Sequence, residues 1–265
     1  MSTVQTPSET LLKRDRLIVL AALFGIGALA WVYMVHEARA MANTGVCCCA
    51  GMKMSGPDMD AWSPIQIVPL FLMWTEMMVA MMVPSAAPMI LVFASVNRKR
   101  RADERPFVPT GIFLLGYLAV WTGFSALAAV TQWALHSRAL LSPMMVSTSP
   151  ILGGTLLCAA GIFQWTPLKN ACLTHCRSPL SFLMTDWREG KSGAFVMGLK
   201  HGAHCTGCCW FLMALLFVAG VMNMWWVAII SILVLLEKVA PKGLWLGRIV
   251  GALLIVWGVW VVLGR

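Results

Sequence analysis

Long apolar runs separated by short polar stretches dominate this chain. A bilayer core about 30 Å thick is crossed by roughly 20 apolar residues of helix. Seven segments come close to that length: residues 17–35, 65–96, 110–135, 151–165, 194–221, 224–239 and 244–263. The fourth is short, and the second is long enough to tilt or to break at Pro84 and Pro88. The pattern predicts an all-α fold: one polytopic transmembrane helical bundle of about seven spans, without a soluble domain.

The composition supports this interpretation and sets an orientation. Hydrophobic residues make up 59% of the 265 positions and charged residues only 12%, as is typical of a multi-pass membrane protein. Most of the 20 Lys and Arg residues fall on one side if the N-terminus is cytoplasmic, and basic residues accumulate in cytoplasmic loops. We therefore expect the N-terminus inside and the C-terminus outside. Anionic lipid headgroups account for the net charge of +9, and no nucleic-acid partner is expected.

The first apolar segment could be a signal peptide, because Ala38-Arg39-Ala40 resembles a cleavage site. Its apolar stretch is about 19 residues, however, against the usual 7–15 of a signal peptide. We expect a retained membrane anchor.

Soft metal ligands gather in the fifth apolar segment. Two imidazoles and three thiols lie within nine residues there: His201, His204, Cys205, Cys208 and Cys209. At about 100° per residue, the first four fall within roughly a 100° arc of a helix. Neutral imidazole and thiolate are ligands of zinc and copper, although a cysteine often packs simply as a small apolar residue. We interpret the cluster as a metal site within the bundle.

Two further groups of cysteines could add ligands. Cys172 and Cys176 follow the fourth segment on the predicted cytoplasmic side, close enough in sequence to fold under the fifth segment. The alternative is a pair of reduced cytoplasmic thiols. Cys47, Cys48 and Cys49 lie in a predicted outer loop, where soft sulfur could capture monovalent copper. A disulfide with one cysteine left over is equally open for that loop.

Methionines line the second apolar segment. Met73, Met77 and Met81 form a stripe at helical spacing, which is more often adaptable packing than a ligand ladder, so these are weak candidate contacts. Glu76 lies among them near mid-bilayer, where an unpaired carboxylate is costly. Its expected partner is a histidine of the fifth segment, a bound cation or Lys200. The alternative is a neutral Glu76 that donates a hydrogen bond to a backbone carbonyl.

A second acidic residue, Glu237, ends the sixth segment. A carboxylate near a helix C-terminus opposes the macrodipole and so needs a cation. Lys200 and Lys242 are the candidates at similar depth, and a structural ion pair between helices is favoured over a role in transport.

Three stretches together resemble a known family. They are residues 77–84 (MMVAMMVP), residues 165–179 from Trp165-Thr166-Pro167 to Ser178-Pro179, and the run from Gly198-Leu199-Lys200-His201-Gly202 to Glu237-Lys238. They resemble a bacterial family of predicted metal-binding integral membrane proteins, classed as a domain of unknown function. The resemblance implies a multi-pass protein of the inner (plasma) membrane with no established reaction. Its suspected metal site falls here on Cys172, Cys176, His201, Cys205, Cys208 and Glu237, with Glu76 in the methionine-rich second segment.

The favoured function is the handling or delivery of a soft transition metal, with copper first and zinc second. Its partners would be membrane lipids, other membrane subunits or a metallochaperone, and no enzymatic reaction is indicated. The spacing of Cys205 and Cys208 also fits a thiol–disulfide oxidoreductase. A third possibility is an accessory subunit of a larger membrane complex, since 13 Trp and 22 Gly suit packing against other membrane helices.

Overall fold

The fold is helical throughout the described part of the chain. The computed structural model describes residues 7–44, 64–102, 108–138, 141, 149–221 and 223–264. These residues form ten α-helices and one short 3-10 helix, η1 (Pro64–Gln66). The helices are α1 (Pro7–Thr44), α2 (Ile67–Ala102), α3 (Thr110–Ser137), α4 (Pro150–Phe163), α5 (Pro167–Arg177), α6 (Pro179–Asp186), α7 (Gly190–Ala214), α8 (Leu216–Ala219), α9 (Met224–Val239) and α10 (Gly243–Leu263). The predicted all-α class is confirmed.

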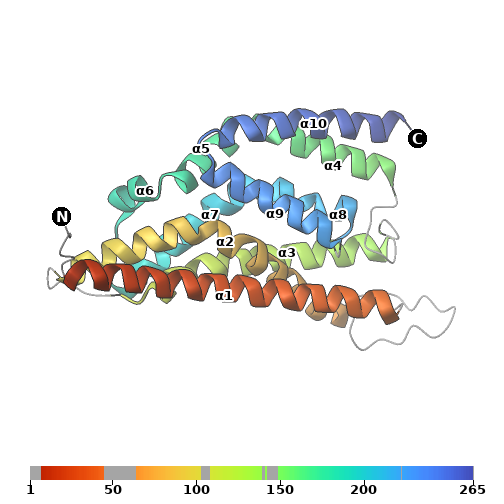
Figure 1. Ribbon diagram of the computed structural model, residues 1–265. Helices are drawn as coiled ribbons and strands as arrows, with labels where there is room; N and C mark the ends of the chain where they lie inside the picture. The colour runs from red at the N-terminus through yellow and green to blue at the C-terminus, as the bar shows by residue number, and fades with distance from the viewer. Residues whose placement is uncertain are drawn as a thin grey trace, which may run out of the picture.

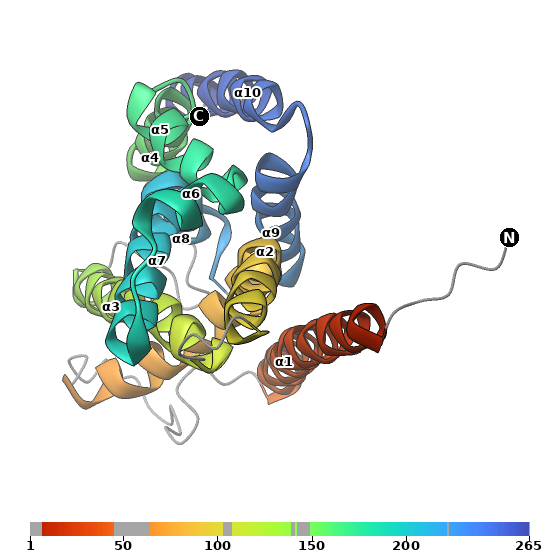
Figure 2. The ribbon, with the colours of Figure 1, turned by 90° about the vertical axis from the view of Figure 1, so that its left-hand side faces the viewer.

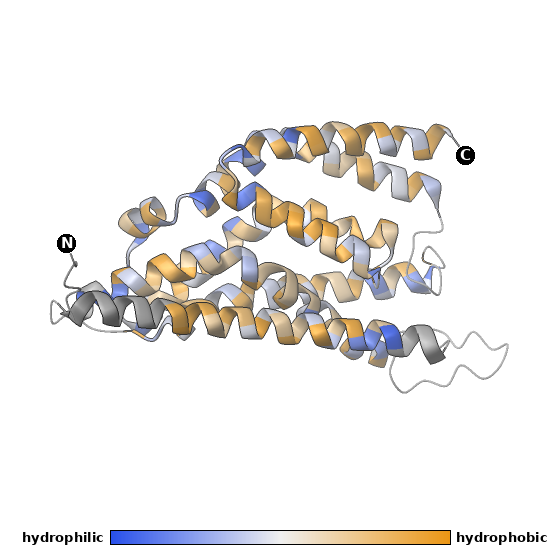
Figure 3. Cartoon of the chain, viewed as in Figure 1, coloured by the Kyte–Doolittle hydropathy of each residue, from blue (hydrophilic) through white to orange (hydrophobic). Residues whose placement is uncertain are grey.

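The long helices run roughly along one axis, and the start of α1 and the end of α10 lie at opposite ends of the bundle (Figure 1). Seen along that axis, α1 lies outside the other helices and packs on α2 (Figure 2). Helices α3 and α7 form one close pair and α4 and α10 another. Hydrophilic residues gather on α5 and at the neighbouring end of α9 (Figure 3). The polar helix α5 thus lies against the end of α9, with the short helix α6 following it (Figure 1).

Five helices are long and apolar enough to cross a membrane: Leu17–Arg39, Ile67–Arg98, Thr110–Ser137, Gly190–Ala219 and Gly243–Leu263. A sixth span results if α4 and α5, bent by 63° at their junction, count as one. The sixth predicted segment is α9, whose 16 residues extend about 24 Å, short of the bilayer core. Helix α2 continues through Pro84 and Pro88, so the break considered there does not occur.

Glycines allow the closest helix contacts. A Cβ on Gly198 of α7 would collide with the carbonyl oxygen of Phe113 in α3, and one on Gly116 of α3 would collide with that of Phe195. Between α4 and α10, a Cβ on Gly161 would lie 2.6 Å from the carbonyl oxygen of Gly251. Small residues at these positions let the backbones approach, and this approach places α7 deep in the bundle.

Capping side chains set the turn between α4 and α5 and the start of α4. Ser149 accepts a hydrogen bond from the backbone N–H of Leu152 at 3.3 Å, and Thr166 accepts one from that of Lys169 at 3.3 Å. In both helices proline occupies the first turn, where its missing N–H costs nothing. The polar stretch after the fourth apolar segment therefore starts a new helix, α5, which carries Cys172 and Cys176 toward α7.

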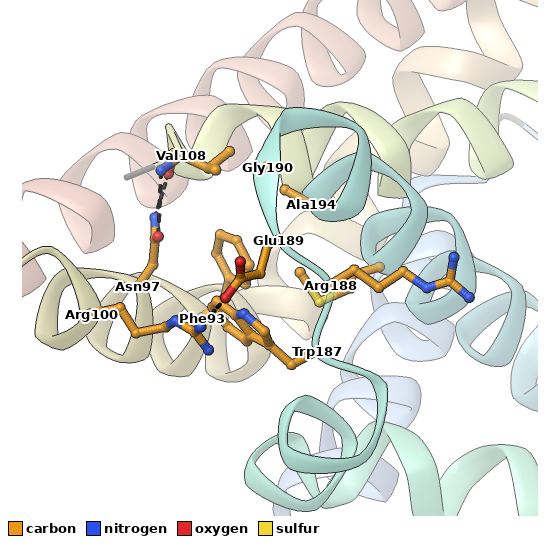
Figure 4. A pocket seen from close by; sticks show the side chains of 10 residues that line it. Phe93, Asn97, Arg100, Val108, Trp187, Arg188, Glu189, Gly190 and Ala194 are labelled. Carbon is orange, nitrogen blue, oxygen red and sulfur yellow. Dashed lines mark hydrogen bonds and ion pairs between the residues drawn. The ribbon is translucent and has the colours of Figure 1, made fainter. Parts of the chain in front are cut away.

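A polar clamp fixes the beginning of α7 against the end of α2 (Figure 4). The guanidinium of Arg100 lies 4.6 Å from the ring centroid of Trp187 and forms an ion pair with Glu189. Nearby, the side-chain amide of Asn97 donates to the carbonyl of Val108, which ties α2 to the segment that leads into α3. The small pocket between these side chains contains none of the candidate ligands.

Candidate metal centre

Three thiols of α7 lie in the interior. Cys205, Cys208 and Cys209 are at most 1% exposed and carry free thiols. Cys208 Sγ and Cys209 Sγ each donate to the carbonyl oxygen of Cys205 at 3.0 Å. Cys205 and Cys208 lie on the arc expected from the helical spacing, and Cys209, just outside that arc, is buried as well.

Side chains of α3 and α9 contact the sulfur of Cys205, and both are anchored to α2. Lys238 Nζ of α9 lies 3.0 Å from Cys205 Sγ and also donates to Ser85 Oγ of α2 at 2.8 Å. The hydroxyl of Tyr117 in α3 lies 3.1 Å from the same sulfur and donates to the carbonyl of Met82 at 3.1 Å. A buried ammonium requires polar or anionic partners, and here it finds a hydroxyl and a sulfur.

Helix α5, which packs on α7, carries two further cysteines. Cys176 is buried, and its thiol interacts with those of Cys205 and Cys208 through hydrogen bonding. Cys172 is half-buried, and its Sγ packs 2.9 Å from where a Cβ of Gly207 would lie. The structure therefore brings the two cysteine groups of the sequence together between α5 and α7.

The two histidines of α7 separate. His201 is 3% exposed and stacks on Tyr117 with 5.6 Å between ring centroids. Its Nδ1 is buried and has no hydrogen-bond partner in the described part of the chain. His204 is half-buried and instead stacks on His175 of α5, with centroids 4.3 Å apart and ring planes 9° apart. His201 thus lies beside the buried thiols, whereas His204 lies at the outer edge of the contact between α5 and α7.

The partner of Glu237 differs from the prediction. Lys169 of α5 donates to Glu237 Oε2 at 2.7 Å and to Oε1 at 2.8 Å, and both side chains are 2% exposed. Lys200 instead pairs with Asp186, so the proposed pairs of Glu237 with Lys200 or Lys242 were wrong. The cause is the turn between α4 and α5, which carries Lys169 inward.

Glu76 also has other neighbours than those expected. The charged and polar groups that act on it are Glu37 and Tyr33 of α1, so it faces the outer helix rather than the thiols of α7. Among the described residues, its Oε1 has no hydrogen-bond partner. Neither Lys200, which pairs with Asp186, nor a histidine of α7 is its partner.

The methionine stripe belongs to the packed interior. Met77 and Met81 are 2% and 1% exposed, and Met73 packs partly against the same apolar core. The loop carrying Cys47, Cys48 and Cys49 lies outside the described residues.

A family model described as PpoB2, copper chaperone, matches residues 71–261, which contain all the helices of the thiol cluster. The chain belongs to this copper chaperone family. The match agrees with the metal-related resemblance drawn from the sequence motifs. No curated protein and no solved structure shows significant similarity to the chain.

The residues described hold no preformed group of three His, Cys, Asp or Glu ligands, although soft donor atoms gather between α5 and α7. The thiols of Cys208 and Cys209 both donate hydrogen bonds to the backbone carbonyl of Cys205. Both side chains must therefore rotate to bind an ion. Thiolates are preferred ligands of monovalent copper and of zinc, and buried thiols of α5 and α7 lie beside one another here. The Nδ1 of His201, which has no hydrogen-bond partner among the described residues, offers a further ligand, because His201 stacks on Tyr117, whose hydroxyl contacts Cys205 Sγ.

Proposed function

We propose that this protein binds monovalent copper at the buried thiols of α5 and α7 and delivers it to an acceptor protein. The observation that carries the proposal is the contact of Lys238 with Cys205, 3.0 Å between Nζ and Sγ, beside three further buried thiols. Membership of a copper chaperone family supports copper as the cargo.

The charge of Lys238 favours copper over zinc. Monovalent copper held by two thiolates carries one net negative charge, which a buried ammonium neutralises. Divalent zinc on the same two thiolates is already neutral, so the ammonium would remain unbalanced. An uncompensated charge in a low-dielectric interior costs several kcal/mol, on the order of 3–5.

The setting proposed for this site is the bacterial inner membrane. The five or six apolar helices support a multi-pass arrangement, and the distribution of Lys and Arg supports a cytoplasmic N-terminus. The acceptor would be another membrane subunit or a soluble metallochaperone. The polar helix α5 would then lie toward the cytoplasm, where copper is held as the monovalent ion.

Metal analysis of the purified protein tests the proposal. The wild type, reconstituted with monovalent copper under reducing conditions, should retain the metal against a competing chelator. Cys205→Ser combined with Cys208→Ser should lose it. The matched control is Cys158→Ser, because Cys158 lies in α4 with its Sγ directed at the carbonyl of Ile255, 3.8 Å away, and apart from the cluster. Equal copper content in the double variant and the control would refute the assignment.

Thiol trapping separates copper binding from disulfide exchange. Cys205 and Cys208 are at most 1% exposed, and burial at this level hides a thiol from soluble redox partners. A small membrane-permeant reagent should alkylate both residues slowly in the metal-free protein, bound copper should protect them, and the protection should disappear when the metal is chelated. A reversible disulfide between Cys205 and Cys208 across a redox series would support an oxidoreductase instead.

A further inference from the structure

Two imidazoles mark the exposed edge of the contact between α5 and α7. His175 is exposed, His204 is half-buried, and their rings are nearly parallel with centroids 4.3 Å apart. The ring of Phe182 in α6 lies against His204 with centroids 6.4 Å apart. The pair is formed by two different helices, so its geometry depends on how α5 packs on α7.

The hydrogen bond of His175 prepares this side chain to bind a metal. Its Nδ1 lies 2.8 Å from the carbonyl oxygen of Ala171. A carbonyl can only accept, so Nδ1 carries the proton, and the neutral ring keeps its free lone pair on Nε2. Metal-binding histidines commonly donate their other N–H to a backbone carbonyl in this way, which fixes the tautomer and the ring orientation.

Sulfur ligands continue inward from the pair. Cys172 lies three residues before His175 on α5, and Cys208 lies four residues after His204 on α7, so each cysteine shares a helix face with its histidine. Electrostatic interactions link His204 with Cys208 and Cys172 with Cys208. Cys208 in turn belongs to the buried thiols. The Sγ of Cys172 lies 2.9 Å from where a Cβ of Gly207 would lie, so imidazole and thiol ligands extend inward from the surface pair along the contact between α5 and α7.

Copper can reach the buried thiols only by way of ligands that lie nearer the surface. Cys205 and Cys208 are at most 1% exposed, so a soluble copper donor cannot contact them directly. Imidazole binds monovalent copper, and thiolate is the softer and preferred ligand. Movement from imidazole to thiolate is therefore favourable. In each exchange copper keeps its charge, no electron is transferred, and a thiol that binds releases its proton to water.

We propose that His175 and His204 form a loading site that accepts monovalent copper at the surface and passes it through Cys172 to the buried thiols. This inference rests on the proposed function, since the thiols must be the destination of the metal. It assigns a separate role to His204, which the sequence alone groups with the ligands of the final site.

Loading kinetics test the proposal. The bicinchoninate complex of monovalent copper is mixed with the full-length apo-protein in detergent, and its colour loss reports the transfer rate. His175→Phe combined with His204→Phe keeps two stacked rings but removes the nitrogens, so the fold should persist. The rate should fall by about tenfold or more, while the copper stoichiometry at equilibrium stays that of the wild type. Thr174→Ala is the matched control, because Thr174 is an exposed neighbour on α5 that donates only to the carbonyl of Asn170.

Two results would overturn the loading site. One is a transfer rate in the double phenylalanine variant equal to that of Thr174→Ala. The other is a loss of copper stoichiometry as large as that of Cys205→Ser combined with Cys208→Ser, which would make the histidines part of the final site. Failure of the proposed function looks different, because then the cysteine variants themselves would retain copper.

Discussion

The ion pair between Lys169 and Glu237 gives a quantitative test of the packing of α5 against α9. Replacing Lys169 by Met removes the ammonium but keeps an unbranched side chain of similar length. It leaves the carboxylate of Glu237 at 2% exposure without its cation. Breaking a buried pair in this way costs about 3–5 kcal/mol. At about 1.4 kcal/mol per factor of ten, the unfolding equilibrium should shift by roughly two to four orders of magnitude.

A double-mutant cycle isolates the pair. Unfolding of the purified protein by increasing denaturing detergent gives the free energy of Lys169→Met, of Glu237→Met and of both together. Apolar replacement of both members of a buried pair is often neutral, so the double variant should be markedly more stable than either single variant. The difference measures the coupling between the two charges.

The pair of Arg100 and Glu189 supplies the control, because the Glu189 side chain is 63% exposed. Exposed pairs contribute about 0–1 kcal/mol, so Glu189→Gln should change little. The reasoning would be refuted if Lys169→Met cost no more than Glu189→Gln. It would also be refuted if the losses from the two single apolar variants simply added in the double variant.

Three further outcomes follow from the structure. Gly198→Ala should strongly destabilise the protein in detergent melting, because its Cβ would collide with the carbonyl of Phe113, whereas Gly123→Ala, with no heavy atom within 4 Å of its Cβ, should not. Tyr117→Phe removes a buried hydroxyl that contacts Cys205 at 3.1 Å and a carbonyl of α2 at 3.1 Å, and the same melting assay should show a loss of about 1–3 kcal/mol. Reporter fusions should place the N-terminus in the cytoplasm and the C-terminus outside, and a common location would contradict the predicted orientation.

The apolar pattern predicts the long helices closely. The segments expected at residues 110–135 and 244–263 correspond to α3 (Thr110–Ser137) and α10 (Gly243–Leu263), since continuous apolar stretches of this length leave few alternatives to helix. The turn after Phe163 is less evident in sequence, although the pattern of Thr166 followed by proline is a helix start signal. That turn decides where Lys169 and Cys172 lie.

The spacing of residues predicts which of them share a helix face, but not which residues of other helices contact that face. The arc on α7 correctly groups Cys205 with Cys208, yet it also includes His204, which the structure separates because α5 offers His175 as a stacking partner. Nothing in the sequence pattern indicates Lys169 as the partner of Glu237. The two residues lie 68 positions apart and come into contact only when α5 packs on α9. Contacts of this kind depend on tertiary packing, which the spacing of residues along a single helix does not reveal.

The end of α9 joins the ion pair to the thiols. Glu237 and Lys238 are consecutive, so their side chains leave the helix about 100° apart. One turns to Lys169 of α5 and the other to Cys205 of α7. Arg177, at the end of α5, donates to the carbonyl of Glu237 at 3.0 Å and to that of Ala240 at 2.7 Å, which holds the last turn of α9 in place. The position of the ammonium beside Cys205 is therefore set by α5, the same helix that supplies Cys172 and Cys176.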